Sequence, residues 1–183
     1  RGSYSDPGHW EQDWNRSYEW PKADAEYGVL LLHGMSDSPY AMSHFGKHYK
    51  NKAHVLGLRL PGHGTLPSAL TNIYWQDMAG AVALATQHMK TALGDKPLYL
   101  VGFSTGAALA LNYELERLAT KKLADYSAMI FLSPAIGLSP VAAGAKWQAR
   151  LGTVLGLDKL SWNSIQAEYD PFKYGSFAVN AGD

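Results

Sequence analysis

The amino-acid sequence predicts an α/β fold, in which a mostly parallel β-sheet carries helices on both faces. Four short apolar runs have the length of buried strands, and amphipathic helical patterns separate them in regular alternation. The chain of 183 residues is long enough for one domain with a sizeable core, since 46% of its residues are apolar and only 17% are charged. This composition is typical of a globular protein.

The amino-terminal part leads into the first of these strands. Residues 1–27 are polar and aromatic without a regular period, which predicts an irregular lead-in with room for one short edge strand. The run YGVLLLHG over 27–34 is too short for an isolated helix and predicts a strand buried on both faces. A helix is expected next, because Ser38 can cap it and Pro39 suits its first position. Its expected buried residues are Met42, Phe45 and Tyr49.

The second strand and a long helix follow. AHVLGLRLPGHG over 53–64 predicts a strand that runs into a loop rich in Gly and Pro. The helix is expected to begin at Thr71 or Asn72 and to end at Gly94, because glycine commonly follows the last helical residue. Its expected buried stripe is Trp75, Met78, Val82, Ala85, Met89 and Leu93.

Two further strands complete the pattern. KPLYLVGF over 96–103 predicts the third strand, and YSAMIFLSP over 126–134 predicts the fourth. The helix between them is expected to start at Ser104 and to bury Ala108, Leu111, Leu115 and Leu118. Three strand exits carry polar, Gly-rich sequence: HGMSDS, LPGHGT and GFSTG. Because ligands of such sheets bind outside the carboxyl ends of the strands, we expect a functional site at this edge.

The alternation of strands and helices ends with the fourth strand. We therefore divide the chain into an amino-terminal core, residues 1–134, and a segment of residues 135–183 without a further buried strand. The apolar residues of this segment that recur at helical spacing include Trp147, Leu151 and Leu155.

Composition excludes several classes of function. Sixteen basic and sixteen acidic side chains cancel, so no nucleic-acid surface is expected. The absence of cysteine excludes a disulfide scaffold, a cysteine nucleophile and a cysteine-ligated metal. The histidines show no metal-binding spacing, and no cofactor is expected. No apolar run reaches the roughly 18 residues that span a bilayer. The compartment stays open between the cytoplasm and a secreted or periplasmic location.

The motif G-x-S-x-G occurs over residues 102–106, between the third strand and the next helix. Short motifs also arise by chance, but a strand before and a helix after are the context in which this motif presents a serine nucleophile. The sharp turn needs small neighbours, and Gly102, Gly106 and Ala107 meet that need. We predict that Ser104 is a nucleophile; the alternative is a serine that only caps the helix.

The first strand ends in HGMSDSP, which predicts the second part of a catalytic site. Acyl transfer needs an oxyanion hole, in which N–H donors stabilise the negatively charged oxygen of the intermediate. The backbone N–H just past such a strand can face the serine, together with the N–H that follows the serine. The predicted donors are the backbone N–H groups of Met35 and Thr105. The alternative is an ordinary turn between a strand and a helix.

A serine nucleophile also needs a base. The seven histidines are His9, His33, His44, His48, His54, His63 and His88, and all precede the motif. His33 and His63 lie at strand exits and are the weaker candidates for the base, because each can simply brace its loop. His54 is expected near the surface. Of the acids after the motif, Glu114 is expected on the polar face of its helix and Asp125 at the opposite edge of the sheet.

Three motifs occur in one order on these elements: His33-Gly34, LPGHG over 60–64 and GFSTG over 102–106. Together they resemble the α/β-hydrolases, and most of all the carboxylesterases and monoacylglycerol-lipase-like enzymes. The resemblance covers roughly residues 27–134. It implies a serine hydrolase that cleaves carboxylic esters of small or lipid-like apolar acyl groups through an acyl-enzyme on Ser104.

The resemblance also implies what lies outside these residues. In this family the acid and the histidine follow the nucleophile on later strands, and this sequence has no histidine there. Both are therefore expected in a carboxy-terminal portion, in the same polypeptide or as a separate fragment. The chain would then end within the cap, or lid, with Trp147, Leu151 and Leu155 either roofing an acyl pocket or packing on the sheet.

A second hypothesis is a non-catalytic member of this fold that binds a small apolar ligand. A complete chain without a histidine after the serine would fit it. Against it stands the apolar fourth strand, which would leave an exposed sheet edge. The motifs leave open the acyl length, the choice among ester, thioester and amide, and the oligomeric state.

Overall fold

The structure is a computed structural model, which describes residues 15–65 and 67–136. The expected lid residues Trp147, Leu151 and Leu155 lie outside the described residues, as does almost all of the segment 135–183. The division of the chain at residue 134 therefore stays a prediction.

The described residues form strands, α-helices and two short 3₁₀ helices (η) in the expected alternation. In chain order they are β1 (Tyr18–Trp20), β2 (Tyr27–Leu32), η3 (Pro39–Met42), α1 (Ser43–Tyr49), β3 (Ala53–Leu58), η4 (Pro67–Asn72), α2 (Trp75–Leu93), β4 (Leu98–Phe103), α3 (Thr105–Ala119) and β5 (Ala128–Leu132).

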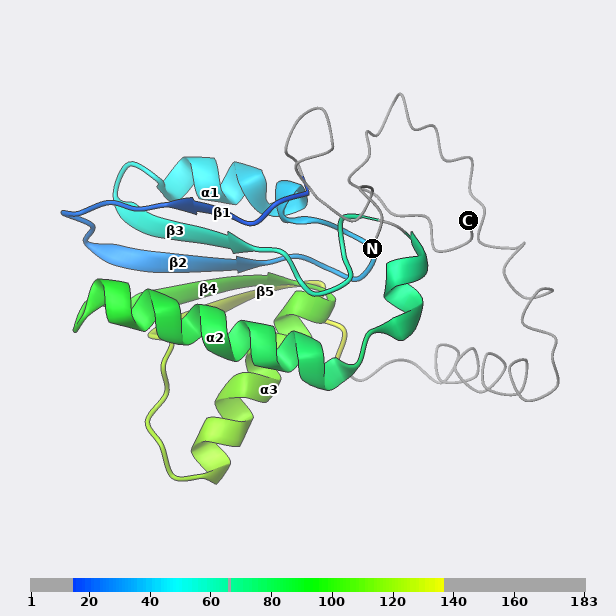
Figure 1. Cartoon of the computed structure of the whole chain (residues 1–183). Coiled ribbons are helices and arrows are strands. Elements are labelled where there is room, and N and C mark those ends of the chain that lie inside the picture. The colour runs from blue at the N-terminus through cyan, green and yellow to red at the C-terminus, as the bar shows by residue number, and fades with distance from the viewer. Residues whose placement is uncertain (1–14, 66, 137–183) are drawn as a thin grey trace, which may run out of the picture.

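The strands form one mostly parallel sheet in the order β1-β3-β2-β4-β5. Strands β2, β3, β4 and β5 are parallel, and β1 pairs antiparallel with β3. Helix α1 covers one face of the sheet, and α2 and α3 cover the other (Figure 1). The predicted fold class and the short edge strand in the lead-in are both confirmed.

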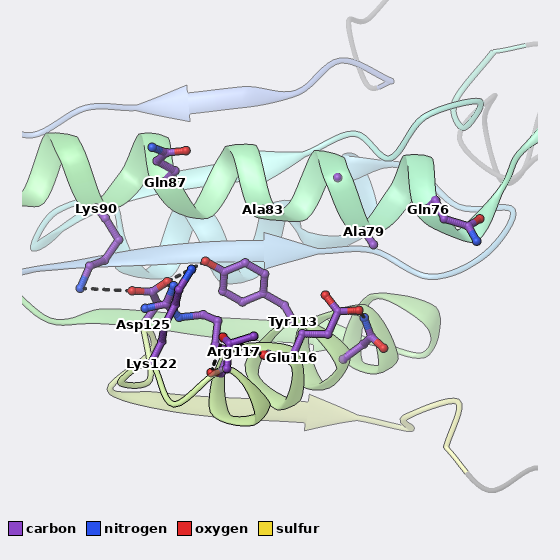
Figure 2. Close-up of a pocket in the computed structure, with 13 residues that line it drawn as sticks. Gln76, Ala79, Ala83, Gln87, Lys90, Tyr113, Glu116, Arg117, Lys122 and Asp125 are labelled. Carbon is purple, nitrogen blue, oxygen red and sulfur yellow. Dashed lines mark hydrogen bonds and ion pairs between the residues drawn. The ribbon is translucent and has the colours of Figure 1, made fainter.

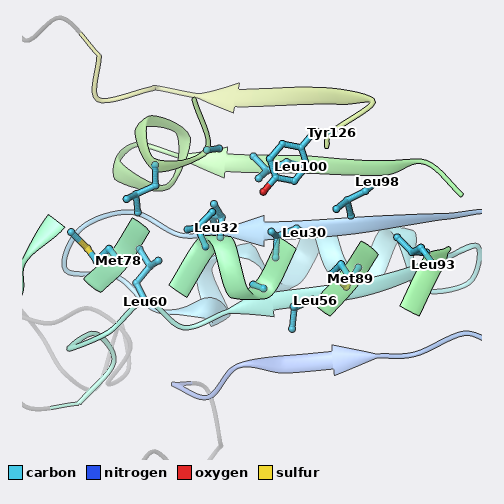
Figure 3. Close-up of a cluster of buried hydrophobic side chains, with 14 residues drawn as sticks. Leu30, Leu32, Leu56, Leu60, Met78, Met89, Leu93, Leu98, Leu100 and Tyr126 are labelled. Atoms are coloured by element: carbon cyan, nitrogen blue, oxygen red, sulfur yellow. The ribbon is translucent and has the colours of Figure 1, made fainter. Parts of the chain in front are cut away.

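Strand β2 explains why a continuous apolar run is needed. Val29 and Leu31 point to the α1 side, while Leu30 and Leu32 point to the side of α2 and α3. The larger cluster (Figure 3) consists of Leu30, Leu32, Leu56, Leu60, Met78, Val82, Ala85, Met89, Leu93, Leu98, Leu100, Leu109, Ala110 and Tyr126. Burying a large apolar side chain contributes about 1.5–3 kcal/mol, so this two-sided core is the main source of stability.

Helix α2 starts later than the sequence predicts. Thr71 lies in η4, where its hydroxyl donates to the Ser68 carbonyl oxygen over 2.7 Å instead of capping a helix. The helix begins at Trp75, and the backbone N–H of Tyr74 donates to the Asp77 carboxylate over 3.4 Å. Gly94 ends the helix as expected, with φ of 62°. The rest of the predicted stripe is buried, but Trp75 is 39% exposed.

Other expected helix faces are corrected. In α1, Phe45 is 36% exposed, whereas the small residues Ser43 and Gly46 are buried. In α3, the expected inner residues Leu115 and Leu118 are exposed. Helix α3 instead buries Thr105, Gly106, Ala107, Leu109, Ala110 and Glu114. Short side chains let the helix approach the sheet closely, which outweighs the larger apolar area of the leucine stripe.

Glu114 is the largest departure from the sequence pattern. It is 4% exposed, and its Oε1 accepts hydrogen bonds from the backbone N–H groups of Asp125 and Tyr126, both at 2.9 Å. These bonds compensate Oε1 for lost water, whereas the buried Oε2 has no hydrogen-bond partner among the described residues. Glu114 therefore ties α3 to the chain that enters β5.

The order of the strands places the carboxyl ends of β2, β3 and β4 side by side. Strand β2 is central, with β3 on one side and β4 on the other. The chain thus reverses its direction of winding around β2, and the crevice at such a switch point is where sheets of this kind bind ligands. None of the described helices is long and apolar enough to cross a membrane.

Candidate active site

Ser104 occupies the junction between β4 and α3. Its φ is 49° and its ψ is −112°, a conformation that costs a non-glycine residue about 1–3 kcal/mol. Its backbone N–H donates to the Leu132 carbonyl oxygen over 2.9 Å, which fastens the junction to β5. Within the described part of the chain its hydroxyl makes no capping bond to α3. These features do not fit the alternative of a simple capping serine.

The two motif glycines are required by close packing. A Cβ on Gly102 would lie 2.7 Å from Cα of Ala107, and a Cβ on Gly106 would lie 2.6 Å from the carbonyl oxygens of Leu32 and His33. Both distances are shorter than real contacts allow, so only glycine permits the amino end of α3 to pack on β2 and β4. The nucleophile prediction relied on small residues on both sides of Ser104, and close packing explains why Gly102 and Gly106 must be small.

The exit of β2 packs directly against Ser104. A Cβ on Gly34 would lie 2.9 Å from Cδ1 of Phe103 and 3.3 Å from Cβ of Ser104. Met35 follows in a turn, where its carbonyl oxygen accepts a 2.7 Å hydrogen bond from the Ser36 hydroxyl. The structure thus brings the loop that carries Met35 beside the serine.

Thr105 is the first residue of α3, so its N–H has no acceptor within the helix. Thr105 as a whole is 8% exposed. The amino end of a helix carries partial positive charge, which favours a negative oxygen beside Ser104. The role of Met35 and Thr105 as oxyanion donors stays a prediction, and it concerns their backbone rather than their side chains.

His33 is fully buried behind this loop. Its Nδ1 lies 2.8 Å from the carbonyl oxygen of Gly34, and its Nε2 lies 3.1 Å from the backbone nitrogen of Leu60. Burial lowers the pKa of His33 to about 3. Because both ring nitrogens are engaged with the backbone, His33 is a poor candidate for the base that activates Ser104.

His63 is also fully buried, and its ring meets the His33 ring edge-on with 5.1 Å between the centroids. Its Nδ1 lies 2.9 Å from the Pro61 carbonyl oxygen, and burial lowers its pKa. Its Nε2 has no hydrogen-bond partner among the described residues. The structure therefore does not pair His63 with the Ser104 hydroxyl.

The remaining candidates are structural. His54 was expected near the surface but is 7% exposed in β3, where its Nε2 lies 2.6 Å from Glu19 Oε1. Asp125 precedes β5 at the far edge of the sheet, as predicted, and pairs with Arg117 at 2.9 Å. Sequence reasoning overlooked Leu60, whose backbone N–H holds His33, because no side-chain pattern marks a backbone donor.

One groove lies between two helices on a face of the sheet. It has a volume of about 800 Å³ and lies between α2 and α3, with Gln76, Ala83, Tyr113, Glu116 and Asp125 in its lining. Figure 2 shows the Asp125 carboxylate between the side chains of Lys90 and Tyr113. Among the described residues, no group of three histidine, aspartate or glutamate side chains could hold a metal ion.

Comparison with known proteins defines the family. Residues 29–179 match the model of the alpha/beta hydrolase family, which is more than half of the chain. The chain belongs to the alpha/beta hydrolase family. No curated protein sequence matches this hydrolase-family chain. The predicted resemblance to the α/β-hydrolases is confirmed at the level of the family.

Solved structures show the same fold at low sequence identity. One of the metagenome-derived lipolytic enzymes LipS and LipT has a TM-score of 0.57 at 21% identity, over 70% of this chain and 49% of its own length. MenH from S. aureus has a TM-score of 0.56 at 19% identity, over 92% of this chain and 65% of its own length. A thermostable carboxyl esterase from Bacillus coagulans has a TM-score of 0.54 at 18% identity, over 88% of this chain and 50% of its own length. The chain thus spans about half to two thirds of these structures.

Proposed function

We propose that this hydrolase-family chain is the amino-terminal part of a serine hydrolase that cleaves carboxylic esters. The observation that carries the proposal is the strained backbone of Ser104 at the junction of β4 and α3, with its hydroxyl free of any capping bond to the helix. A non-glycine residue persists in such a conformation only where its surroundings enforce it, and such positions cluster at active sites.

In the proposed reaction, Ser104 gives its hydroxyl proton to the base, and its Oγ attacks the acyl carbon of the ester to form a tetrahedral intermediate. The backbone N–H groups of Met35 and Thr105 donate hydrogen bonds to the oxyanion of this intermediate. Its collapse releases the alcohol, which takes up a proton, and leaves an acyl-enzyme. Water then attacks the acyl group, so that the carboxylic acid leaves and Ser104 regains its proton.

The base and its acid partner are proposed to come from a carboxy-terminal portion of the protein. No histidine follows Ser104 in the sequence, and both ring nitrogens of His33 already bind backbone groups. On β5, Ile130 is 50% exposed although the strand is parallel and apolar. Parallel sheets are normally covered on both faces, which supports further structure over this face of β5.

The proposed acyl group is small or lipid-like and apolar. Two apolar residues adjacent to the site are partly exposed, with Met35 at 51% and Phe103 at 36%. Apolar side chains around a few polar groups are typical of small-molecule sites. We extend the proposal to residues 135–183 as a cap over this surface, with Trp147, Leu151 and Leu155 facing the acyl chain.

The rival is a protein of the same fold that binds an apolar ligand without catalysis. Among the described residues no histidine is paired with the Ser104 hydroxyl, which is the observation in its favour. The two functions differ in whether Ser104 reacts covalently. An activated serine reacts with a fluorophosphonate, whereas an unassisted serine is a weak nucleophile.

The test treats the full-length protein with a fluorophosphonate probe and locates the label by mass spectrometry. We expect labelling at Ser104, and loss of both label and ester turnover by several orders of magnitude in Ser104→Ala. Ser133→Ala is the matched control, because Ser133 also has a positive φ, 43°, at the next strand exit. Ester turnover close to wild type in Ser104→Ala would disprove the proposal.

A further inference from the structure

Helix α1 and the turn after it carry charge of one sign. The whole chain is neutral, but no acidic residue occurs from position 38 to position 76. Within this stretch, Lys47, Lys50 and Lys52 lie on α1 and in the turn that leads into β3, and all three are exposed. The carbonyl end of a helix favours nearby cations. That preference does not account for the absence of acids over the strand and loops that follow.

The inner side of α1 is already occupied, so its charged side chains face outward. Ser43 and Gly46 are buried against the sheet. A Cβ on Gly46 would lie 2.8 Å from the Trp20 ring and 3.1 Å from the Tyr18 hydroxyl oxygen, so the helix packs closely on β1. Figure 1 shows α1 on the face of the sheet opposite to α2 and α3. The outer side of α1 is therefore free to meet a partner from solution.

Aromatic side chains accompany these lysines. Phe45 on α1 is 36% exposed. The Lys50 ammonium lies 5.8 Å from the centroid of the half-buried Trp20 ring. Aromatic rings favour the boundary between water and acyl chains, and a lysine can cover apolar surface with its stem while its ammonium meets an anionic headgroup. Lysine combined with exposed aromatic residues is typical of a surface that rests on a membrane.

Acidic residues on the neighbouring strands do not cancel this charge. The Glu19 carboxylate on β1 accepts from His54 and from His88 of α2, which places it on the opposite face of the sheet. Glu26 lies beside Lys52, because its backbone N–H donates to the Lys52 carbonyl oxygen over 3.0 Å. None of the three lysines forms an ion pair with any residue that the structure describes. Their charges are therefore available to an external anion.

We propose that this α1 basic surface, formed by Lys47, Lys50, Lys52, Phe45 and Trp20, docks the protein on a membrane that contains anionic lipids. Lysine is a compact point charge that suits a fluid layer of headgroups, whereas protein and nucleic-acid partners more often select the planar fork of arginine. For a hydrolase of lipid-like esters, docking concentrates the enzyme where such esters gather. The docking itself does not require the proposed ester hydrolysis.

The first test measures how the full-length protein distributes between buffer and sedimented vesicles. The vesicles consist of phosphatidylcholine alone or of phosphatidylcholine with about 30% phosphatidylglycerol. We expect binding to the anionic vesicles and little binding to the neutral ones. Binding should weaken as salt is added, because salt screens exposed charges. A protein that stays in solution with the anionic vesicles would overturn the proposal.

Substitution of the lysines locates the contact. Each lysine near an anionic surface strengthens binding about fivefold, so the combined variant Lys47→Gln, Lys50→Gln, Lys52→Gln should bind about 100-fold more weakly. Its melting temperature should stay close to that of the wild type, because all three side chains are exposed. Undiminished vesicle binding by this variant would overturn the assignment to α1.

The matched control removes the same charge elsewhere. It combines Lys96→Gln, Lys121→Gln and Lys122→Gln, which replace exposed lysines before β4 and after α3. We expect this control to bind the anionic vesicles within about threefold of the wild type, because these lysines lie outside the α1 basic surface. Equal losses in the two triple variants would show that net charge alone drives binding, and would overturn the proposal.

Phe45→Ala tests whether the surface meets a membrane or a soluble anionic partner such as an acidic protein. Burial of the ring among lipids is not screened by salt, so the variant should bind anionic vesicles several-fold more weakly at both low and high salt. Binding equal to that of the wild type would mean that only the lysines make contact, and would overturn the assignment to a membrane.

Docking and catalysis are tested separately. Ser104→Ala should bind anionic vesicles as the wild type does, because Ser104 lies at the junction of β4 and α3 and outside the α1 basic surface. If Ser104→Ala keeps its ester turnover, the proposed function is wrong and docking is unaffected. If Ser104→Ala is inactive while the variant at Lys47, Lys50 and Lys52 binds like the wild type, only docking is wrong.

Discussion

The two ends of the parallel sheet are built differently. At the carboxyl end, Ser104 has a strained backbone, Gly34 and Gly106 pack without room for a side chain, and His33 is buried in neutral form. At the amino end, charged groups find partners: Glu114 accepts two backbone N–H bonds, and Asp125 pairs with Arg117. One end therefore holds geometry at a cost in stability, while the other contributes stability.

Polar contacts at the amino side also secure the edge of the sheet. Glu19 on β1 accepts from Nε2 of His54 at 2.6 Å and from Nε2 of His88 at 2.8 Å. These bonds link the short edge strand β1 to β3 and α2. The contrast predicts that substitutions at the carboxyl end change turnover, whereas substitutions at the amino end change stability.

The largest expected effect is at Gly34. Valine there would clash with Phe103 and Ser104 and displace the loop after β2 that carries Met35, the proposed oxyanion donor. We expect kcat to fall about 10²–10³-fold, or roughly 2.7–4 kcal/mol in activation free energy, as measured in an ester assay. Gly80→Ala is the control, because a Cβ on Gly80 meets nothing within 4 Å and should leave kcat unchanged. A change in KM alone for Gly34→Val would contradict the oxyanion assignment.

The next effect is at Glu114, at the other end. Glu114→Ala leaves the part-buried N–H of Asp125 and the buried N–H of Tyr126 without their acceptor, and should lower the free energy of unfolding by about 1–3 kcal/mol. Glu114→Gln keeps an acceptor oxygen and should lose less. Glu116→Ala, on the exposed face, should change stability by less than about 0.5 kcal/mol. Denaturant melts measure all three, and a loss of kcat in folded Glu114→Ala would contradict the division between the two ends.

Strain at Ser104 gives a smaller effect of opposite sign. Ser104→Ala keeps a Cβ in the positive-φ conformation, whereas Ser104→Gly removes it. We expect the glycine variant to be more stable than the alanine variant by about 1–2 kcal/mol, with both inactive toward esters. Equal melting temperatures for the two variants would show that the backbone here is not strained.

The smallest effect is the pH dependence of stability at Glu19. Burial raises the pKa of Glu19, but hydrogen bonds and charge from His88 and His54 outweigh it, so the pKa lies below the ordinary value of 4.5. A lowered pKa in the folded state contributes stability above pH 4.5 that is lost as the pH falls through the folded pKa. Glu19→Gln should therefore cost less than about 1 kcal/mol near neutral pH, and nearly nothing in acid. Thermal melts of wild type and Glu19→Gln from neutral pH down to acid check this prediction, because the stability difference between them should shrink as the pH falls.

Much of the fold could be predicted because its signals are local. The continuous run in β2 reflects burial on both faces, and the Gly94 stop of α2 reflects backbone preference. Ser104 between two glycines marked the junction, since the turn needs small neighbours regardless of what lies further away. The nucleophile prediction thus rests on constraints within a few residues.

Tertiary structure decided what the sequence could not. The burial of Glu114 depends on N–H groups eleven and twelve residues away, and the bond from His33 to Leu60 spans twenty-seven. The outward face of α3 depends on how closely its small residues approach the sheet. Periodicity records only the polarity of a side chain, whereas burial also depends on partners that distant segments supply. The sequence by itself determined the strands, their exits and the candidate serine. Only the packing of separate segments decided which histidine is locked, which glutamate is buried and which leucines are exposed.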